Sequence, residues 1–308
     1  MAFGDIYRKQ AALLVRVLSF VAEEDCFALK GGTAINLFLR EMPRLSVDID
    51  LTYVPVQPRP ESLTAIEAAL MRIAKGIRTG IPGAQVTEGR PGDEKALTKL
   101  FPRSEGVQVE IEVTPVMRGC IGAPEQRRVS ASVEDMFGFA EVPMLTFADL
   151  YGGKLVAALD RQHPRDLFDV RELLANEGID DKLRRAFIVY LISHRRPMHE
   201  VLAARRKDIT TLYQRDFDGM TAEPVSLEEL TATREALIAN IVGTMPEAHK
   251  QFLISFERGA PDWKLLGLPA VTELPAVKFR QQNLNTLTKD QRTALVANLE
   301  KVLDAKRA

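Results

Sequence analysis

The chain has 308 residues, enough to bury one large hydrophobic core or two modest ones. Its hydrophobic content of 46%, charged content of 27% and net charge of −1 are ordinary for a soluble globular protein and exclude a global attraction to nucleic acid. The two cysteines, Cys26 and Cys120, lie far apart without metal-ligand spacing, which argues against a disulfide framework and favours a reducing cytoplasm. No apolar run approaches the ~18 residues that cross a bilayer, so we expect a cytoplasmic protein without a membrane segment.

An amphipathic pattern covers the first part of the chain up to Val21. Ile6, Leu13 and Val17 supply its apolar positions, and charged residues such as Arg16 lie between them. A secretory signal needs an uninterrupted apolar stretch. The pattern therefore predicts a docking helix.

A glycine pair follows the next apolar segment. That segment contains Leu29, and Gly31 and Gly32 precede the first turns of a helix whose apolar side includes Ile35. Two glycines let the backbone approach a ligand closely, and the start of a helix presents free N–H groups to an anion. A glycine pair alone is usually just a turn, but here it predicts a phosphate-binding turn that ends at Thr33.

Residues 44–51 alternate between polar and apolar, which predicts a half-buried strand. On such a strand Ser46, Asp48 and Asp50 project from one face. Two neighbouring carboxylates repel each other unless a cation lies between them. An Asp-x-Asp by itself is often solvated surface, whereas a carboxylate pair after a phosphate-binding turn indicates metal-assisted phosphoryl or nucleotidyl transfer.

Residues 107–113 alternate strictly and predict a second strand, with Gln108, Glu110 and Glu112 on one face. Two divalent ions need more oxygen ligands than two aspartates provide. Either glutamate can supply a third carboxylate, or both can belong to an exposed strand face.

A mostly apolar helix is predicted over residues 147–160, with Lys154 near its middle. Such a lysine either extends to solvent or points toward phosphate, for which a compact cation is suited. Gly152 and Gly153 cost about 1 kcal/mol each relative to alanine inside a helix. They indicate either close packing of this helix or a later helix start.

The next predicted helix carries Asp166 and Asp169 on one face. Asp166 follows Arg165 and reads as a surface pair. Arg161 and His163 read as structural or solvated.

After Asp180 the pattern is helical to the end, broken by prolines. Thr288 and Gln291 have the spacing of a capping box and predict a final helix. A local basic run is either a solvated face or a surface that binds RNA phosphates. The run consists of Arg184, Arg185, Arg195, Arg196, Arg205, Arg206 and Lys207.

Three separated segments together resemble a known family, the nucleotidyltransferase toxins of the AbiEii/AbiGii type, which include the MenT toxins and belong to the DNA polymerase β-like nucleotidyltransferase superfamily. The likeness is convincing over about the first 175 residues, and the three motifs agree in their order. The matching segments are Leu29 to Phe38, Ser46 to Leu51, and Asp149 to Ala158 with Arg161 and Arg165 to Val170.

The resemblance implies an α/β fold: a polymerase β-like nucleotidyltransferase core with a mixed sheet over residues 1–175, followed by an all-helical domain over residues 176–308. It implies a metal-dependent enzyme that transfers a nucleoside monophosphate from an NTP to RNA, most often the 3′ end of tRNA. It also implies the toxin of a toxin–antitoxin pair, with an AbiEi-like antitoxin as partner.

The resemblance also implies a role for each site residue. Gly31, Gly32 and Thr33 would hold the triphosphate with help from Ser46 and Lys154. Asp48, Asp50 and Glu110 would bind Mg²⁺, with Mn²⁺ as an alternative, and Glu112 remains a second candidate for the third carboxylate. Asp48, Asp50, Lys154 and Asp169 would form the catalytic set, with Asp169 positioning a metal ligand or the acceptor.

Two other interpretations remain open. The enzyme could modify a small molecule, as antibiotic nucleotidyltransferases do, and scattering of the basic run over several faces would favour this. A nucleotide-binding regulator without transfer activity is the second, and the retained pair of repelling carboxylates argues against it.

Overall fold

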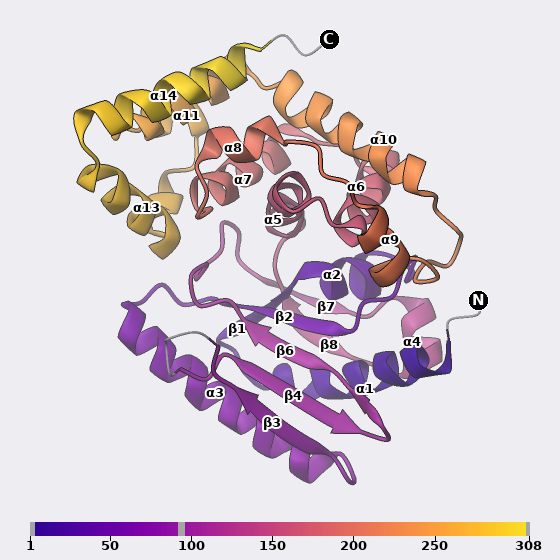
Figure 1. The fold of residues 1–308 in the computed structure, drawn as a ribbon. Coiled ribbons are helices and arrows are strands. Elements are labelled where there is room, and N and C mark those ends of the chain that lie inside the picture. The colour runs from indigo at the N-terminus through magenta and orange to yellow at the C-terminus, as the bar shows by residue number, and fades with distance from the viewer. Residues whose placement is uncertain (1–3, 92–95, 306–308) are drawn as a thin grey trace. The chain divides into compact units, whose positions relative to one another are not determined.

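The protein divides into two units, which we describe from a computed structural model covering residues 4–91 and 96–305 (Figure 1). A sheet unit comprises Met1–Thr146 with Gly219–Pro224, and a helical unit comprises Phe147–Asp218 with Val225–Ala308. The sequence suggested a boundary at residue 175, whereas the division by contacts comes at Phe147. The difference arises because the helices that directly follow Thr146 pack among the later helices.

The sheet unit alternates helices and strands, in keeping with the α/β fold that the sequence predicts. Its elements are α1 (Asp5–Val21), β1 (Phe27–Lys30), α2 (Gly31–Ala34), the π-helix η1 (Ile35–Leu39), β2 (Asp48–Tyr53), α3 (Arg59–Gly80), β3 (Gln85–Gly89), β4 (Lys99–Ser104), β5 (Val107–Gln108), β6 (Glu110–Val113), β7 (Glu125–Arg128), α4 (Ala131–Phe137) and β8 (Glu141–Met144).

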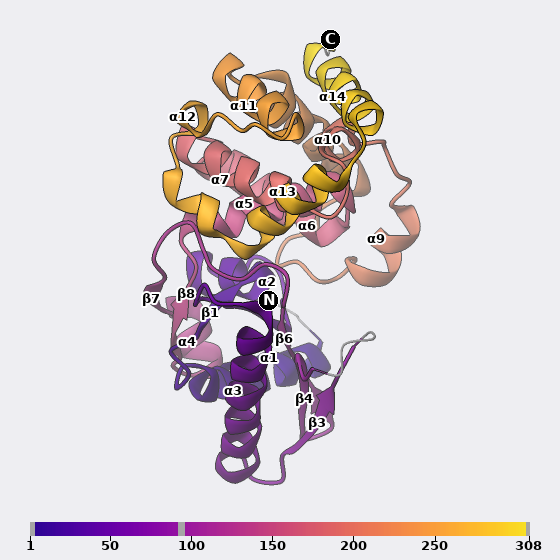
Figure 2. The same cartoon turned by 90° about the vertical axis from the view of Figure 1, so that its left-hand side faces the viewer.

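The strands form one mixed sheet, as expected. Their order is β3-β4-β6-β2-β1-β8-β7, with β5 beside β4. The pairs β2–β6 and β1–β8 are parallel, and the other pairs are antiparallel. Helices α1 and α3 pack on each other and cover one face of the sheet (Figures 1 and 2). In the order of the strands, β2 lies inside the sheet, between β1 and β6.

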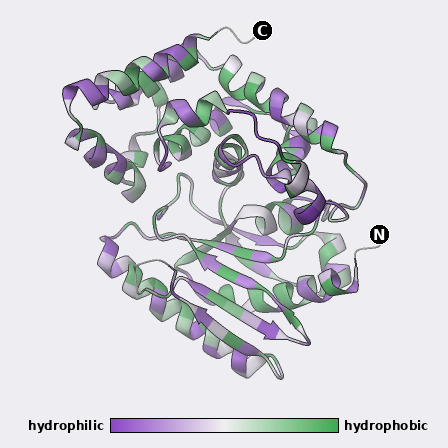
Figure 3. Ribbon diagram, in the orientation of Figure 1, coloured by the Kyte–Doolittle hydropathy of each residue, from purple (hydrophilic) through white to green (hydrophobic). Residues whose placement is uncertain are grey.

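Strands β2 and β6 separate an apolar face from a polar one. Ile49, Leu51, Ile111 and Val113 are fully buried. The acidic residues that alternate with them are only partly buried, and Figure 3 shows hydrophobic and hydrophilic residues alternating along the strands. The apolar rows form the core of the sheet unit, and the acidic rows face the opposite side.

Strand β2 begins at Asp48, later than the expected start at residue 44. Strand β1 ends opposite Asp50, because α2 starts at Gly31, and so β1 offers no partner to the preceding residues. The chain before β2 pairs instead with the segment 219–224, where Leu45 N–H donates to the Met220 oxygen over 2.9 Å. Ser46 consequently lies before the strand and not on its face.

The strand expected over residues 107–113 is interrupted at Val109. The register of β4 with β5 and with β6 is continuous across the gap. Val109 N–H donates to the Pro102 oxygen over 3.0 Å, but proline has no N–H to complete the pair. The strand is thus interrupted because Pro102 lacks a hydrogen-bond donor. The register is unchanged, so Glu110 and Glu112 keep the common face that the alternation predicts.

The helical unit contains α5 (Phe147–Asp160), α6 (Pro164–Asn176), α7 (Asp181–Ile192), α8 (Met198–Ala203), α9 (Thr210–Asp216), α10 (Leu227–Ile238), the π-helix η2 (Ala239–Gly243), α11 (Glu247–Glu257), α12 (Trp263–Leu266), the 3-10 helix η3 (Pro269–Glu273), α13 (Pro275–Thr286) and α14 (Lys289–Asp304). The capping box predicted at Thr288 and Gln291 is confirmed at the start of α14. In the described part of the chain, no helix is long and apolar enough to cross a membrane.

Helix α5 packs closely on α7 within this unit. A Cβ added to Gly152 would lie 3.0 Å from the Ala186 carbonyl carbon and 3.1 Å from the Phe187 nitrogen. The glycines at 152 and 153 lie within α5, so the helix does not start after them. Their purpose is close helix packing, which the sequence left undecided.

Candidate active site

The glycine pair follows β1 directly and forms the first two residues of α2. Gly31 has a φ of +75°, a left-handed conformation that favours glycine. A Cβ at this position would lie 2.3 Å from Oδ2 of Asp50, and a Cβ on Gly32 would lie 2.6 Å from Nη2 of Arg44. The open faces of both glycines are therefore occupied by side chains of the protein itself.

Thr33 and Ser46 connect α2 to the start of β2. The Thr33 hydroxyl donates to the main-chain oxygen of Asp48 (2.5 Å) and lies 3.0 Å from the Ser46 hydroxyl. Both side chains are buried. The Thr33 hydroxyl thus holds the Asp48 backbone in place, and Ser46 contacts Thr33. Both hydroxyls are engaged within the protein, so the backbone N–H groups of the turn are the candidates for binding a triphosphate.

The predicted carboxylates lie together on the polar face of the sheet. In the parallel pair of β2 and β6, Asp48 is in register with Glu110, and Asp50 is in register with Glu112. Neighbouring strands are about 4.8 Å apart, and alternate residues of one strand are about 6.6 Å apart. The four carboxylates therefore occupy the corners of a small rectangle.

Two lysines extend this arrangement, and sequence reasoning missed both. Lys30 is in register with Asp50 on β1, and Lys99 is in register with Glu112 on β4. Lys30 Nζ donates to the Thr114 hydroxyl over 2.8 Å. Burial lowers the pKa of Lys30. The negative charges of Asp50 and Glu112 act in the other direction but do not outweigh the burial. Each lysine lies opposite an acidic residue of the neighbouring strand. That pairing could have been predicted only if the order of the strands had been known.

Lys99 bridges the two glutamates. Its Nζ lies 2.7 Å from Oε1 of Glu110 and 3.0 Å from Oε2 of Glu112. Burial alone would lower the pKa of Lys99, but the hydrogen bonds to both glutamates outweigh it and raise that pKa. The third metal ligand expected at Glu110 is thus engaged by an internal cation.

The carboxylates of Asp48 and Asp50 fit a magnesium ion whose other ligands come from the substrate. Among residues 4–91 and 96–305, no group of three or more histidine, cysteine or acidic side chains is arranged to hold a metal ion. Mg²⁺ commonly binds one or two carboxylates together with phosphate oxygens of the substrate. Asp48 and Asp50, on one strand face and beside the Gly31 turn, offer such a pair.

The helical unit holds the other expected site residues in one buried ion cluster. Lys154 Nζ lies 2.8 Å from Oδ1 of Asp166 and 3.0 Å from Oδ2 of Asp169. All three side chains are at least nine-tenths buried. The shared face predicted for Asp166 and Asp169 is confirmed, since both contact the same lysine.

Asp166 is the centre of this cluster, so its interpretation as a surface pair with Arg165 was wrong. Arg161 donates to both of its carboxylate oxygens, over 2.5 and 2.9 Å. Burial alone would raise the pKa of Asp166, but the charges of Lys154 and Arg161 outweigh it and hold this pKa well below its ordinary value. No local pattern indicates this cluster, because the distance between α5 and α6 is set by tertiary packing.

Several members of the basic run are tied up within the helical unit. Arg184 is buried and donates to the main-chain oxygens of Asn240 and Ile241 over 3.0 and 2.9 Å. Arg196 pairs with Asp160 and Glu200. The expectation that the whole run is available to RNA is therefore wrong for Arg184.

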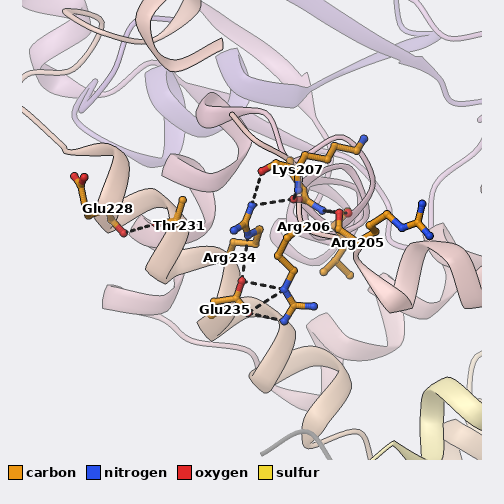
Figure 4. A network of polar contacts seen from close by, with 9 residues as sticks. Arg205, Arg206, Lys207, Glu228, Thr231, Arg234 and Glu235 are labelled. Carbon is orange, nitrogen blue, oxygen red and sulfur yellow. Dashed lines mark hydrogen bonds and ion pairs between the residues drawn. The ribbon is translucent and has the colours of Figure 1, made fainter. Parts of the chain in front are cut away.

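Residues 205–207, the last part of the basic run, also make contacts within the helical unit. Arg206 pairs with Glu235, with 2.5 Å between Nη2 and Oε2, and Arg234 donates to the Lys207 oxygen over 2.9 Å (Figure 4). Arg205 is exposed, and its guanidinium points away from these pairs. Arg195 is exposed as well.

Comparisons with known proteins agree with this fold and identify the family. No curated protein matches the sequence. Among solved structures, MenT4, a nucleotidyltransferase toxin from Mycobacterium tuberculosis H37Rv, is similar in fold with a TM-score of 0.54 and 18% sequence identity, over 98% of this chain and 95% of that chain. The family model described as "Nucleotidyl transferase AbiEii toxin, Type IV TA system" matches residues 12–277. Because this match covers most of the sequence, the chain belongs to the AbiEii family of nucleotidyltransferase toxins of type IV toxin–antitoxin systems.

Proposed function

We propose that the protein transfers a nucleoside monophosphate from an NTP to the 3′ end of a tRNA, with Mg²⁺ held by Asp48 and Asp50. The observation that carries this proposal is the contact between the Gly31 turn and the Asp50 carboxylate. The backbone that we propose to bind the triphosphate lies directly beside a carboxylate pair, and this supports the proposal. A divalent cation bound there supplies charge neutralisation at the phosphate oxygens.

The chain's own residues would act as follows. The N–H groups of the turn from Gly31 to Thr33 bind the triphosphate, and Thr33, which also contacts Ser46, fixes the position of Asp48. The acceptor hydroxyl oxygen forms a bond to the α-phosphorus, the bond from that phosphorus to the bridging oxygen breaks, pyrophosphate leaves and the hydroxyl proton is released to water. The proposed catalytic roles of Lys154 and Asp169 are supported by the family resemblance, and within the helical unit Asp169 holds the Lys154 ammonium.

Membership of a type IV toxin–antitoxin family implies an antitoxin as partner and a nucleotide as substrate. We propose an AbiEi-like protein as that antitoxin. The choice of tRNA as acceptor is supported by the family resemblance and by the exposed arginines at 195 and 205.

A small-molecule acceptor is the second candidate. The observation that favours it is the internal pairing of Arg184, Arg196 and Arg206, which leaves a less continuous basic surface than the sequence suggested. Electrostatic RNA binding depends on the number of phosphates that are neutralised.

One assay separates these functions. The protein is incubated with Mg²⁺, each α-labelled NTP in turn, and either total tRNA or a panel of hydroxyl-bearing small molecules. Label on tRNA supports the proposal, and label on a small molecule alone replaces it with the second candidate. NTP binding without any labelled product would indicate a regulator.

A further inference from the structure

Four charged side chains form a row across four adjacent strands of the sheet unit. Lys30 on β1, Asp50 on β2, Glu112 on β6 and Lys99 on β4 are in register with one another. Residues in register on neighbouring strands share a face of the sheet. The row thus has a cation at each end and two carboxylates between them.

Asp48 and Glu110 form the next row on the same face. Lys99 reaches from the first row to this second one, since its Nζ contacts both Glu110 and Glu112. Its side chain is 24% exposed, so the two ion pairs are partly shielded from water. One lysine thereby holds both glutamates of β6.

This arrangement bears on the number of metal ions that the site can take. A two-metal site places its cations roughly 3.5–4 Å apart and needs carboxylates that bridge or flank both. The oxygens of Glu110 and Glu112 that face Lys99 are already bound to an ammonium group. A second divalent ion at these oxygens would be close to that group, and like charges at such a separation repel strongly in a partly buried site.

We infer that the sheet binds one divalent cation, on Asp48 and Asp50, and that Lys99 provides the fixed positive charge for Glu110 and Glu112 in place of a second metal ion. The inference rests on the proposed function, because it concerns the cation assigned there. It makes Lys99 a positioning residue, which keeps the β6 glutamates away from the metal.

Lys30 completes the arrangement from the other end of the row. The Lys30 ammonium donates a hydrogen bond to Thr114, and residue 30 is in register with Asp50 of the neighbouring strand. It is thus positioned to limit the repulsion between Asp50 and Glu112 when no divalent cation is bound. On this basis Glu110 is the ion-pair partner of Lys99 and takes no part in binding the metal.

Metal stoichiometry tests the inference without any measurement of transfer. The metal-free full-length protein is titrated with Mn²⁺, and free Mn²⁺ is measured by electron paramagnetic resonance, with and without an NTP analogue that has a methylene group between the α and β phosphates. We expect one protein-bound Mn²⁺ per wild-type chain and two per Lys99→Met chain. Lys99→Arg should keep one, since the charge remains, and Lys75→Met on the exposed side of α3 is the matched control.

A second variant keeps the test valid if Lys99→Met does not fold. Glu110→Gln should leave Mn²⁺ affinity nearly unchanged, because Glu110 pairs with Lys99 and takes no part in binding the metal. Asp50→Asn removes a proposed metal ligand and should lower the affinity by at least about tenfold. Two Mn²⁺ per wild-type chain, an unchanged count in folded Lys99→Met, or loss of binding in Glu110→Gln would each overturn the inference alone. If no variant binds Mn²⁺ under either condition, the metal-dependent function falls with it.

Discussion

Gly31 and Asp50 are in direct contact, so that a Cβ on residue 31 would lie 2.3 Å from the Asp50 carboxylate oxygen. The backbone of residue 31 is also left-handed, with φ of +75°. The turn that follows β1 and the second carboxylate of β2 are therefore fixed by the same close approach.

Gly31→Ala should abolish transfer and destabilise the fold, because the added methyl group displaces Asp50. Gly83→Ala is the matched control, since Gly83 has a φ of +70° and nothing within 4 Å of an added Cβ. Backbone strain alone should cost the control about 1–2 kcal/mol. Transfer assays and urea unfolding check this, and an active Gly31→Ala enzyme would contradict the contact.

Asp48→Asn should lose transfer activity while the fold is retained. The amide is nearly the same size as the carboxylate but lacks the charge that a divalent cation requires. The Thr33 hydrogen bond goes to the main-chain oxygen of Asp48 and survives the change. Circular dichroism and the labelled-NTP assay decide this, and activity close to wild type would remove Asp48 from the mechanism.

Lys154→Met should destabilise the helical unit by on the order of 3–5 kcal/mol, because it leaves two buried carboxylates without their shared cation. Arg161→Met also removes a partner of Asp166, but the Arg161 side chain is 63% exposed. Arg161→Met should therefore lower the free energy of unfolding by a much smaller amount than Lys154→Met. Denaturant unfolding of the two variants measures the contrast, and equal losses would argue against a buried cluster.

The cluster also predicts a pH dependence of stability. The pKa of Asp166 is lowered by folding, so its contribution is fully present above its unfolded pKa, about 4, and is lost as the pH falls further toward the folded pKa. Wild type should therefore lose stability between about pH 4 and pH 2 more steeply than Asp166→Asn. Unfolding midpoints measured across this range check the slope, with exposed Asp218→Asn as control.

Arg195→Glu with Arg205→Glu should weaken tRNA binding and reduce its salt dependence by roughly one unit of slope per arginine, if each contacts one phosphate. Lys9→Glu with Lys75→Glu changes the net charge equally at exposed positions of the sheet unit. Filter binding at several salt concentrations provides the measurement. Equal effects of the two double variants would show that only net charge matters.

The sequence by itself determined the elements that depend on local pattern. The alternation in β2 and β6, the glycine pair before α2 and the capping box of α14 each express a periodicity or a backbone preference of neighbouring residues. The shared faces of Asp48 with Asp50, and of Glu110 with Glu112, followed from that alternation alone.

Only the tertiary structure decided which charges meet. Lys30 and Lys99 reach the carboxylates because β1 and β4 lie beside β2 and β6, and strand order is not written in any local period. Lys154 meets Asp166 because α5 and α6 pack together, which moved an apparent surface residue into a buried cluster. Contacts between distant segments depend on how hydrophobic faces are buried together, and that is a property of the whole fold.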